Sequence, residues 1–204
     1  MLPPVRRPLL RRLATLTAGC VVLGLGVAML LTADLGSDGF SSLVNGLAMR
    51  TDLQFFVANL AVSVLFLAMA AVRGVIPGIG TLVQIMVVGL VVDRLLLVLE
   101  TPGTLLGQVV LLSAAFPVLA VGIAAYLGMH LGAGPIEAAG LAWDPPVPFK
   151  WSYSAVQGGG ALVGWLLGAT IGPGTIAVIV LLGPAVDLTA RALRLDVHQG
   201  SHEH

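Results

Sequence analysis

Apolar residues gather along this chain in long runs, which short polar or glycine- and proline-rich stretches separate. Six runs are each long enough to cross a bilayer core of about 30 Å, at about 1.5 Å of rise per helical residue. They occupy residues 14–33, 54–72, 80–99, 105–127, 151–169 and 174–193. The pattern predicts an all-α integral membrane protein with about six transmembrane helices.

The composition indicates that the chain lies in a lipid bilayer, which we expect to be its main partner. Hydrophobic residues make up 57% of the 204 residues, charged residues make up 10%, and the mean hydropathy is +1.01. Soluble domains carry about 25% charged residues. A net charge of zero offers no basic surface for nucleic acid. Cys20 is the only cysteine in the sequence, which excludes an internal disulfide and a cysteine-based zinc site.

The distribution of lysine and arginine predicts that both termini face the cytoplasm. If the chain has six spans and an internal N-terminus, only Arg50 falls plainly outside, and Arg94 lies within a span. The cytoplasmic set is Arg6, Arg7, Arg11, Arg12, Arg73, Lys150, Arg191 and Arg194. We therefore expect a multi-pass protein of the bacterial inner membrane. Residues 1–13 would form a basic cytoplasmic N-terminus, and residues 195–204 a disordered cytoplasmic tail.

Two stretches of the chain repeat one pattern. PGIGTLVQIMVVGLVVD (77–93) and IGPGTIAVIVLLGPAVD (171–187) share Gly-x-Gly-Thr near their starts and a final aspartate. Further matching motifs divide the chain into two repeats, residues 14–99 and 105–194, each with three spans and one short polar segment. Because three is an odd number, the second repeat must enter the membrane from the opposite side. The sequence thus predicts two inverted three-helix repeats, each with a short half-helix, as in many secondary transporters.

This layout resembles the YczE/YyaS/YitT family of bacterial integral membrane proteins. The resemblance covers about residues 12–194 and rests on four motifs: LLTADLGSDGFSSLVNGLA, PGIGTLVQIMVVGLVVD, HLGAGPIEAAGLA and GPGTIAVIVLLGPAVD. The chain departs from the family at WDPPVPFK, where a small basic or polar stretch usually follows the second short segment. The family has no established biochemical activity, so the resemblance implies a fold and no particular substrate.

The short polar segments, residues 34–52 and 130–143, follow the first span of each repeat. Each predicts a half-helix after a glycine turn, and two interpretations stay open. The half-helix lies at the membrane interface, or it re-enters the membrane and lines a pathway. The candidate pathway residues on these segments are Asp34, Asp38, His130 and Glu137, and the turn glycines are Gly36, Gly39, Gly132 and Gly134.

Glycines also cluster before the last span of each repeat and along the fifth span. The turns contain Gly78, Gly80 and Thr81 in the first repeat, and Gly172, Gly174 and Thr175 in the second. Open backbone N–H groups at such a turn attract anions, and small residues also permit close packing, so both interpretations remain. Gly160, Gly164 and Gly168 form a small-residue stripe that packs within the chain or between two copies.

Asp93 and Asp187 end the same apolar run in the two repeats. Ionisable residues inside a membrane are costly, and they usually face a cavity or a partner. A structural role as a helix-terminal cap or ion pair, and a role in proton or cation handling, both stay open. Since Arg191 stands four residues after Asp187 and can pair with it, we expect Asp93 to be the better candidate for ion handling.

The sequence contains no nucleophile–base pair, metal-ligand cluster or cofactor signature. We therefore expect no enzymatic activity, no cofactor and no metal. Two functions remain. The first is a small inverted-repeat transporter or channel of unknown substrate. The second is a scaffold or regulatory subunit that packs against another membrane protein or forms a homodimer.

Overall fold

The computed structural model describes residues 8–143, 146–147 and 149–193, and its regular elements are all helices. They are α1 (Leu9–Thr32), α2 (Gly39–Thr51), α3 (Phe55–Ala71), α4 (Ile79–Leu96), α5 (Leu105–Leu127), α6 (Pro135–Leu141), α7 (Phe149–Leu166) and α8 (Pro173–Ala192). Arg6, Arg7, Arg194 and residues 195–204 lie outside the described residues, as do the side chains of Lys150 and Asp187.

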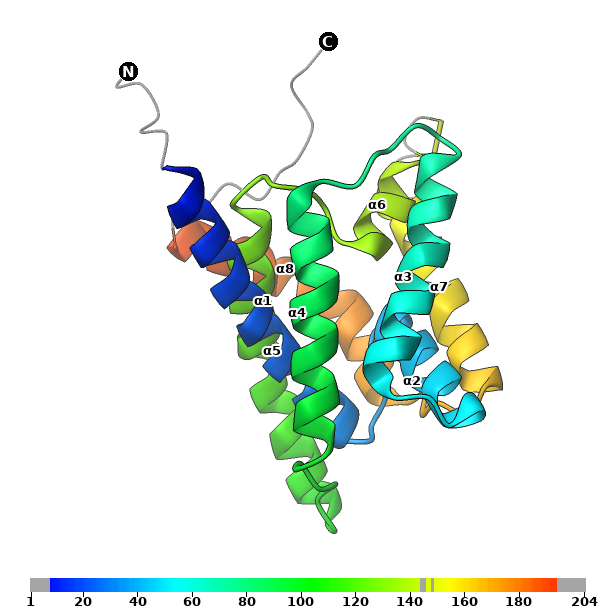
Figure 1. Cartoon of the computed structure of the whole chain (residues 1–204). Coiled ribbons are helices and arrows are strands. Elements are labelled where there is room, and N and C mark those ends of the chain that lie inside the picture. Colours follow the sequence, from blue (N-terminus) through cyan, green and yellow to red (C-terminus); the bar gives the residue numbers. More distant parts are fainter. Residues whose placement is uncertain (1–7, 144–145, 148, 194–204) are drawn as a thin grey trace.

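The long helices α1 and α5 pack against each other in opposite directions. Arg12, near the start of α1, donates hydrogen bonds to the carbonyl oxygens of Met129 (3.1 Å) and His130 (3.3 Å), just after α5 ends. Helix α4 packs against α1, and α8 packs against α5. On the other side of the molecule, α3 contacts α2, α4 and α6, while α7 contacts α2 and α6. Figure 1 shows the two short helices in opposite halves of the molecule, α2 in the lower half and α6 in the upper half.

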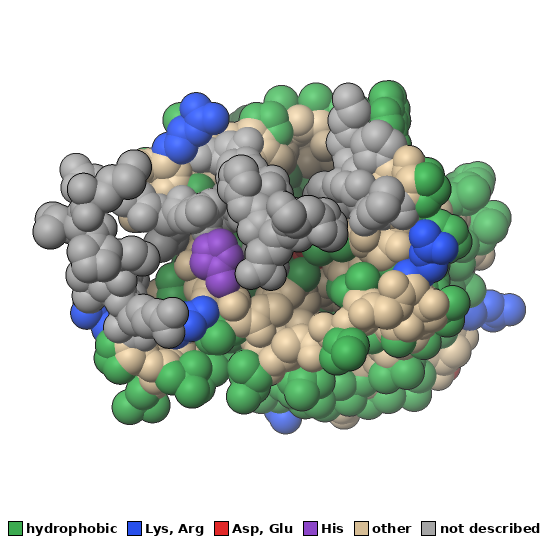
Figure 2. All heavy atoms as spheres, turned by 90° about the horizontal axis from the view of Figure 1, so that it is seen from above, with side chains coloured by type: hydrophobic (Ala, Val, Ile, Leu, Met, Phe, Trp, Pro, Cys, Tyr) green, Lys and Arg blue, Asp and Glu red, His purple; other side chains and the backbone are tan. Residues whose placement is uncertain are grey.

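Four of the described helices are long and apolar enough to cross a membrane: α1, α4, α5 and α8. Helix α3 is apolar but has 17 residues, and α7 has 18 residues but is not apolar enough to be among the four. Large hydrophobic side chains lie exposed on the outer faces, such as Val64 (66% exposed) and Ile176 (67% exposed). Figure 2 shows such side chains around the outer edge of the molecule seen from above. The fold is consistent with a multi-pass membrane protein, and the number of six spans stays a prediction.

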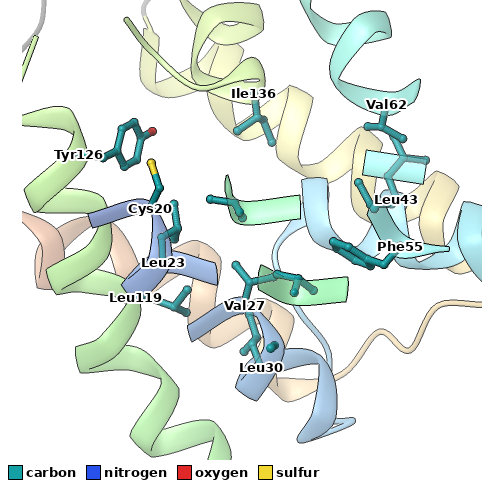
Figure 3. Close-up of a cluster of buried hydrophobic side chains, with 14 of the residues drawn as sticks. Cys20, Leu23, Val27, Leu30, Leu43, Phe55, Val62, Leu119, Tyr126 and Ile136 are labelled. Carbon is teal, nitrogen blue, oxygen red and sulfur yellow. The ribbon is translucent and has the colours of Figure 1, made fainter. Parts of the chain in front are cut away.

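The core centres on the crossing of α1 with α5. Cys20, Leu23 and Val27 of α1 pack there with Leu119 and Tyr126 of α5 (Figure 3). Small residues let the two backbones approach each other. Such close packing is usual between helices in lipid, because the hydrophobic effect does not drive their association there. A Cβ added to Gly122 of α5 would lie 2.5 Å from the backbone nitrogen of Leu23, so the crossing requires glycine at that position.

Candidate functional site

Each glycine turn lies against the loop that precedes the short helix of the other repeat. The backbone N–H of Gly80, at the start of α4, donates to the carbonyl oxygen of Leu131 in the loop before α6 (2.8 Å). The N–H of Gly174, at the start of α8, donates in the same way to the carbonyl oxygen of Leu35 in the loop before α2 (2.8 Å). The two turns therefore hold the two loops that carry the half-helices.

The threonines of the two turns differ in their hydrogen bonds. The hydroxyl of Thr81 accepts from the N–H of Gly78 (3.2 Å) and donates to the carbonyl oxygen of Ala133 (2.6 Å). The hydroxyl of Thr175 is buried and has no partner among the described residues. The hydroxyl of Thr81 thus joins its turn to the loop before α6 by a hydrogen bond, and the hydroxyl of Thr175 forms no such bond among the described residues.

The loops before α2 and α6 use the left-handed backbone region at matching positions. Gly36 (φ 100°) and Gly132 (φ 132°) lie there, and so do Asp34 (φ 53°) and His130 (φ 51°). A Cβ added to Gly132 would come 2.6 Å from the hydroxyl of Thr81, so both conformation and space require glycine. Because the N–H groups of Gly80 and Gly174 already donate to these loops, these two groups are not open to an anion.

The start of α2 is a polar junction with α7. Asp38 caps α2 by accepting the N–H of Ser41 (3.0 Å), which satisfies one of the free donors at a helix start. The next free donor, the N–H of Gly39, donates to Oε1 of Gln157 on α7 (2.6 Å). Nε2 of Gln157 donates in turn to the hydroxyl of Tyr153 (2.9 Å).

The start of α6 carries a second polar group, made by side chains from three helices. Tyr126 of α5 donates its hydroxyl hydrogen to Oε1 of Glu137 on α6 (3.1 Å). The other carboxyl oxygen, Oε2 of Glu137, is buried and has no partner among the described residues, and the same is true of Oε1 of Gln84 on α4. A Cβ on Gly134 would lie 2.5 Å from Oε2 of Glu137 and 3.3 Å from Nε2 of Gln84, so those two atoms are at most 5.8 Å apart.

The two junctions influence each other electrostatically. Burial raises the pKa of Glu137, hydrogen bonds from its own backbone and from Tyr126 lower it, and the charge of Asp38 raises it again. Burial likewise raises the pKa of Asp38, and hydrogen bonds at the start of α2 lower it. Both carboxyls belong to the short helices, outside the helices long enough to cross a membrane. We call the two junctions at the starts of α2 and α6, each with one carboxyl, the polar centre.

The other candidate residues of the sequence lie apart from this centre. Oδ1 of Asp93 accepts the N–H of Phe56 (3.2 Å), so Asp93 sits at the start of α3 in the position of a helix cap. Asp34 is exposed and accepts the hydroxyl hydrogen of Thr170 (2.5 Å). His130 is exposed at the end of α5. The structure therefore places Asp38 and Glu137 at the starts of the two short helices, and the hydrogen bond of Asp93 agrees with the structural role, one of the two that the sequence left open.

Four neutral polar side chains lie around the two carboxyls: Gln84, Tyr126, Tyr153 and Gln157, on α4, α5 and α7. Among them, sequence reasoning considered only Gln84 as a candidate, and it favoured a hydrogen-bonded packing role for this polar residue in an apolar run. Four separate helices contribute to the centre once Glu137 is counted with them, so spacing along the chain could not reveal it.

The glycine stripe of α7 lies inside the molecule, against α2. A Cβ added to Gly160 would lie 2.6 Å from the carbonyl oxygen of Gly39, and one added to Gly164 would lie 2.5 Å from that of Ser42. Gly168 follows the end of α7 with φ 107° and has open space around it. Two of the three glycines thus serve packing within the chain.

Within the described residues, no group of three or more His, Cys, Asp or Glu side chains is arranged to hold a metal ion. The site chemistry that remains is that of carboxyls, hydroxyls and amides. Such groups bind and release protons, accept hydrogen bonds from a donor, or coordinate a small cation with oxygen.

Apolar helices around a buried polar centre define the class of a polytopic helical membrane protein. Within that class, the chain belongs to a family of unknown function, DUF6198, whose model matches residues 10–191. The name YczE/YyaS/YitT, given above as a resemblance, is not confirmed by this match. The chain is also 26% identical over 167 residues to an uncharacterised protein of Haemophilus influenzae, covering 81% of this chain and 77% of that protein. No solved structure matches the chain.

Proposed function

We propose that this protein is a small transporter or channel of the inner membrane, built from two inverted repeats, with its pathway between α2 and α6. The observation that carries the proposal is the polar centre at the starts of these two short helices. Their irregular backbone and buried carboxyls would be unfavourable in contact with lipid, and such groups are tolerated where they line a cavity.

The matching contacts of the two halves support the inverted repeat. Gly80 with Leu131 and Gly174 with Leu35 form the same hydrogen bond at the same length. The left-handed backbone at Asp34 and His130 matches as well. These pairs correspond in the sequence repeat, and α1 and α5, the first helices of the two halves, run in opposite directions (Figure 1). In known transporters, this architecture holds the substrate at the meeting point of the broken helices.

The alternative of a scaffold has less support. It relied on the glycine stripe of α7 as a face for a partner, and Gly160 and Gly164 lie against α2 instead. A protein partner at another face of the molecule is an outcome of the test below.

Flux through liposomes tests the proposal. The purified full chain is reconstituted, and uptake is followed for a panel of small ions, amino acids and sugars, with protein-free and heat-inactivated vesicles as controls. We expect saturable uptake of at least one solute. Absence of uptake across the panel, together with stoichiometric co-purification of another membrane protein, would reject transport in favour of the scaffold.

A further inference from the structure

The group formed by Glu137, Gln84 and Tyr126 contains two buried oxygens that both need a donor. Oε2 of Glu137 and Oε1 of Gln84 are each without a hydrogen-bond partner among the described residues. A buried acceptor without a donor is costly, so an arrangement that satisfies both at once is favoured. Protonation of Glu137 at Oε2 creates such an arrangement, since the carboxylic acid becomes a donor.

Gln84 is a neighbour of Glu137 that offers an acceptor for that hydrogen bond. Its Nε2 and Oε2 of Glu137 are at most 5.8 Å apart, because both lie near one point above Gly134, at 3.3 Å and 2.5 Å. The nitrogen and oxygen of a glutamine amide exchange places by a half turn of the amide group. A small rotation, or one bridging water, then connects the acid to the amide oxygen.

Tyr126 makes the other protonation state possible as well. Its hydroxyl donates to Oε1 of Glu137 (3.1 Å), which stabilises the carboxylate. In this arrangement, Gln84 would accept from the protonated acid, and Tyr126 donates to the carboxylate. A carboxyl with a partner for each state is able to gain and lose a proton without rearrangement of the helices.

The ionisable groups around Glu137 favour proton exchange over a fixed ion pair. Asp38, before α2, and Tyr153 of α7 interact with the carboxyl electrostatically, as Tyr126 of α5 does directly. Among the described residues, no cation is one of the groups that shift the pKa of Glu137. Among the described side chains, therefore, none with a permanent positive charge holds Glu137 as a carboxylate.

We infer that Glu137 is a proton-binding site and that H⁺ is the coupling ion of transport. This inference rests on the proposed transport function for its purpose, but the binding site itself is tested without any transported solute. Gln84 and Tyr126 are positioning residues in it, because each acts through the carboxyl of Glu137.

The sequence allows a direct measurement, since Glu100, Glu137 and Glu203 are its only glutamates. A Glu100→Gln/Glu203→Gln double variant keeps the native side chain at Glu137 and leaves it as the single glutamate. The chain is labelled with ¹³C at the glutamate side-chain carboxyl and placed in lipid nanodiscs. The ¹³C chemical shift of the carboxyl is then followed as the pH changes.

We expect one titration with its midpoint above the ordinary glutamate pKa of 4.5, because burial raises the pKa of the carboxyl. Tyr126→Phe removes the donor of the carboxylate and is expected to raise the midpoint by about one pH unit, as one hydrogen bond predicts. Asp52→Asn is the control. Asp52 is exposed at the end of α2, and asparagine tolerates its left-handed backbone, so the midpoint stays unchanged.

A carboxyl that remains ionised at every pH down to 4.5, or one that remains protonated throughout up to pH 8, would overturn the inference. An unchanged midpoint in Tyr126→Phe would overturn the assigned role of Tyr126. The failures of the two proposals can be told apart. If the protein takes up a solute but Glu137 does not titrate, only the proton site is rejected. If Glu137 titrates but the protein transports no solute, both transport and the role of H⁺ as a coupling ion are rejected.

Discussion

The contact between α2 and α7 offers a sharp test of the fold, through a single methyl group. In Gly164→Ala, the new Cβ would lie 2.5 Å from the carbonyl oxygen and carbon of Ser42. That is 0.9 Å shorter than the 3.4 Å at which ordinary van der Waals contact begins. The opposing atoms are backbone, which cannot rotate away, so the two helices must separate.

Separation by this distance has a measurable cost. The hydrogen bond from the N–H of Gly39 to Gln157 is 2.6 Å long and joins the same two helices, so it lengthens as they part. Overpacking of a tight interface costs about 1–3 kcal/mol. Gly159→Ala is the matched control, because a Cβ at that position of α7 has nothing within 4 Å. Its expected effect is neutral or stabilising by about 0.5 kcal/mol, as for glycine to alanine in a helix.

Cys20 provides the assay. It is the only cysteine of the chain and is fully buried in the core, so it reacts with a thiol-specific dye when the core opens. We expect Gly164→Ala in detergent to expose Cys20 at a lower temperature than the unaltered chain, and Gly159→Ala at the same or a higher one. If Gly164→Ala were as stable as Gly159→Ala, the close contact of α2 with α7 would be refuted.

Four further outcomes are expected. Asp93→Asn keeps an oxygen for the N–H of Phe56, so it should cost no more than about 1 kcal/mol and leave any solute uptake intact; loss of uptake in a folded variant would assign Asp93 to the pathway. Thr81→Val breaks two hydrogen bonds and should lower the stability of the fold by about 1–3 kcal/mol in the Cys20 assay. Thr175→Val should have a smaller effect, because the hydroxyl of Thr175 lacks a partner among the described residues. Equal losses of stability in the two variants would contradict the difference between the turns. Because the pKa of Glu137 is raised on folding, its contribution to stability is complete below its ordinary pKa of 4.5 and falls as the pH rises to the folded-state pKa. Melting temperatures should therefore decline over that range less in Glu137→Gln than in the unaltered chain, and identical slopes would argue against a raised pKa. Reporter fusions at the two ends should both report the cytoplasm, and a periplasmic signal at either end would refute the orientation deduced from arginine positions.

The positions of the helices could be predicted because lipid and backbone chemistry leave few choices. An apolar run must be helical where water cannot satisfy its backbone, so the six apolar segments appear as α1, α3, α4, α5, α7 and α8. The glycine motifs were also informative, because backbone conformation restricts which residues fit at a turn. Gly36 and Gly132 stand at positive φ, a backbone conformation that few other residues adopt readily.

The site was harder to predict because its side chains meet only in three dimensions. Asp93 and Asp187 are ionisable residues at the same position of the two repeats, which made them candidates for ion handling. A helix cap at the same position of both repeats would also require an aspartate there. Asp93 takes such a position before α3. Glu137 became a stronger candidate only when the fold brought Gln84 and Tyr126 to it from other helices.

The polar group around Glu137 is a departure from the symmetry of the sequence repeat. At the spacing of the repeat, Tyr126 corresponds to Leu30 and Gln84 to Val178, and both of these are buried hydrophobic residues. At each of these two positions, one repeat thus has an apolar side chain and the other has a hydrogen-bonding group. Residues that only maintain the shared architecture are needed in both halves, as the glycine turns are. Buried polar groups reduce stability unless they are fully satisfied, so Gln84 and Tyr126, at positions where the other repeat has an apolar side chain, are better explained by a ligand, for which the proton is the smallest candidate.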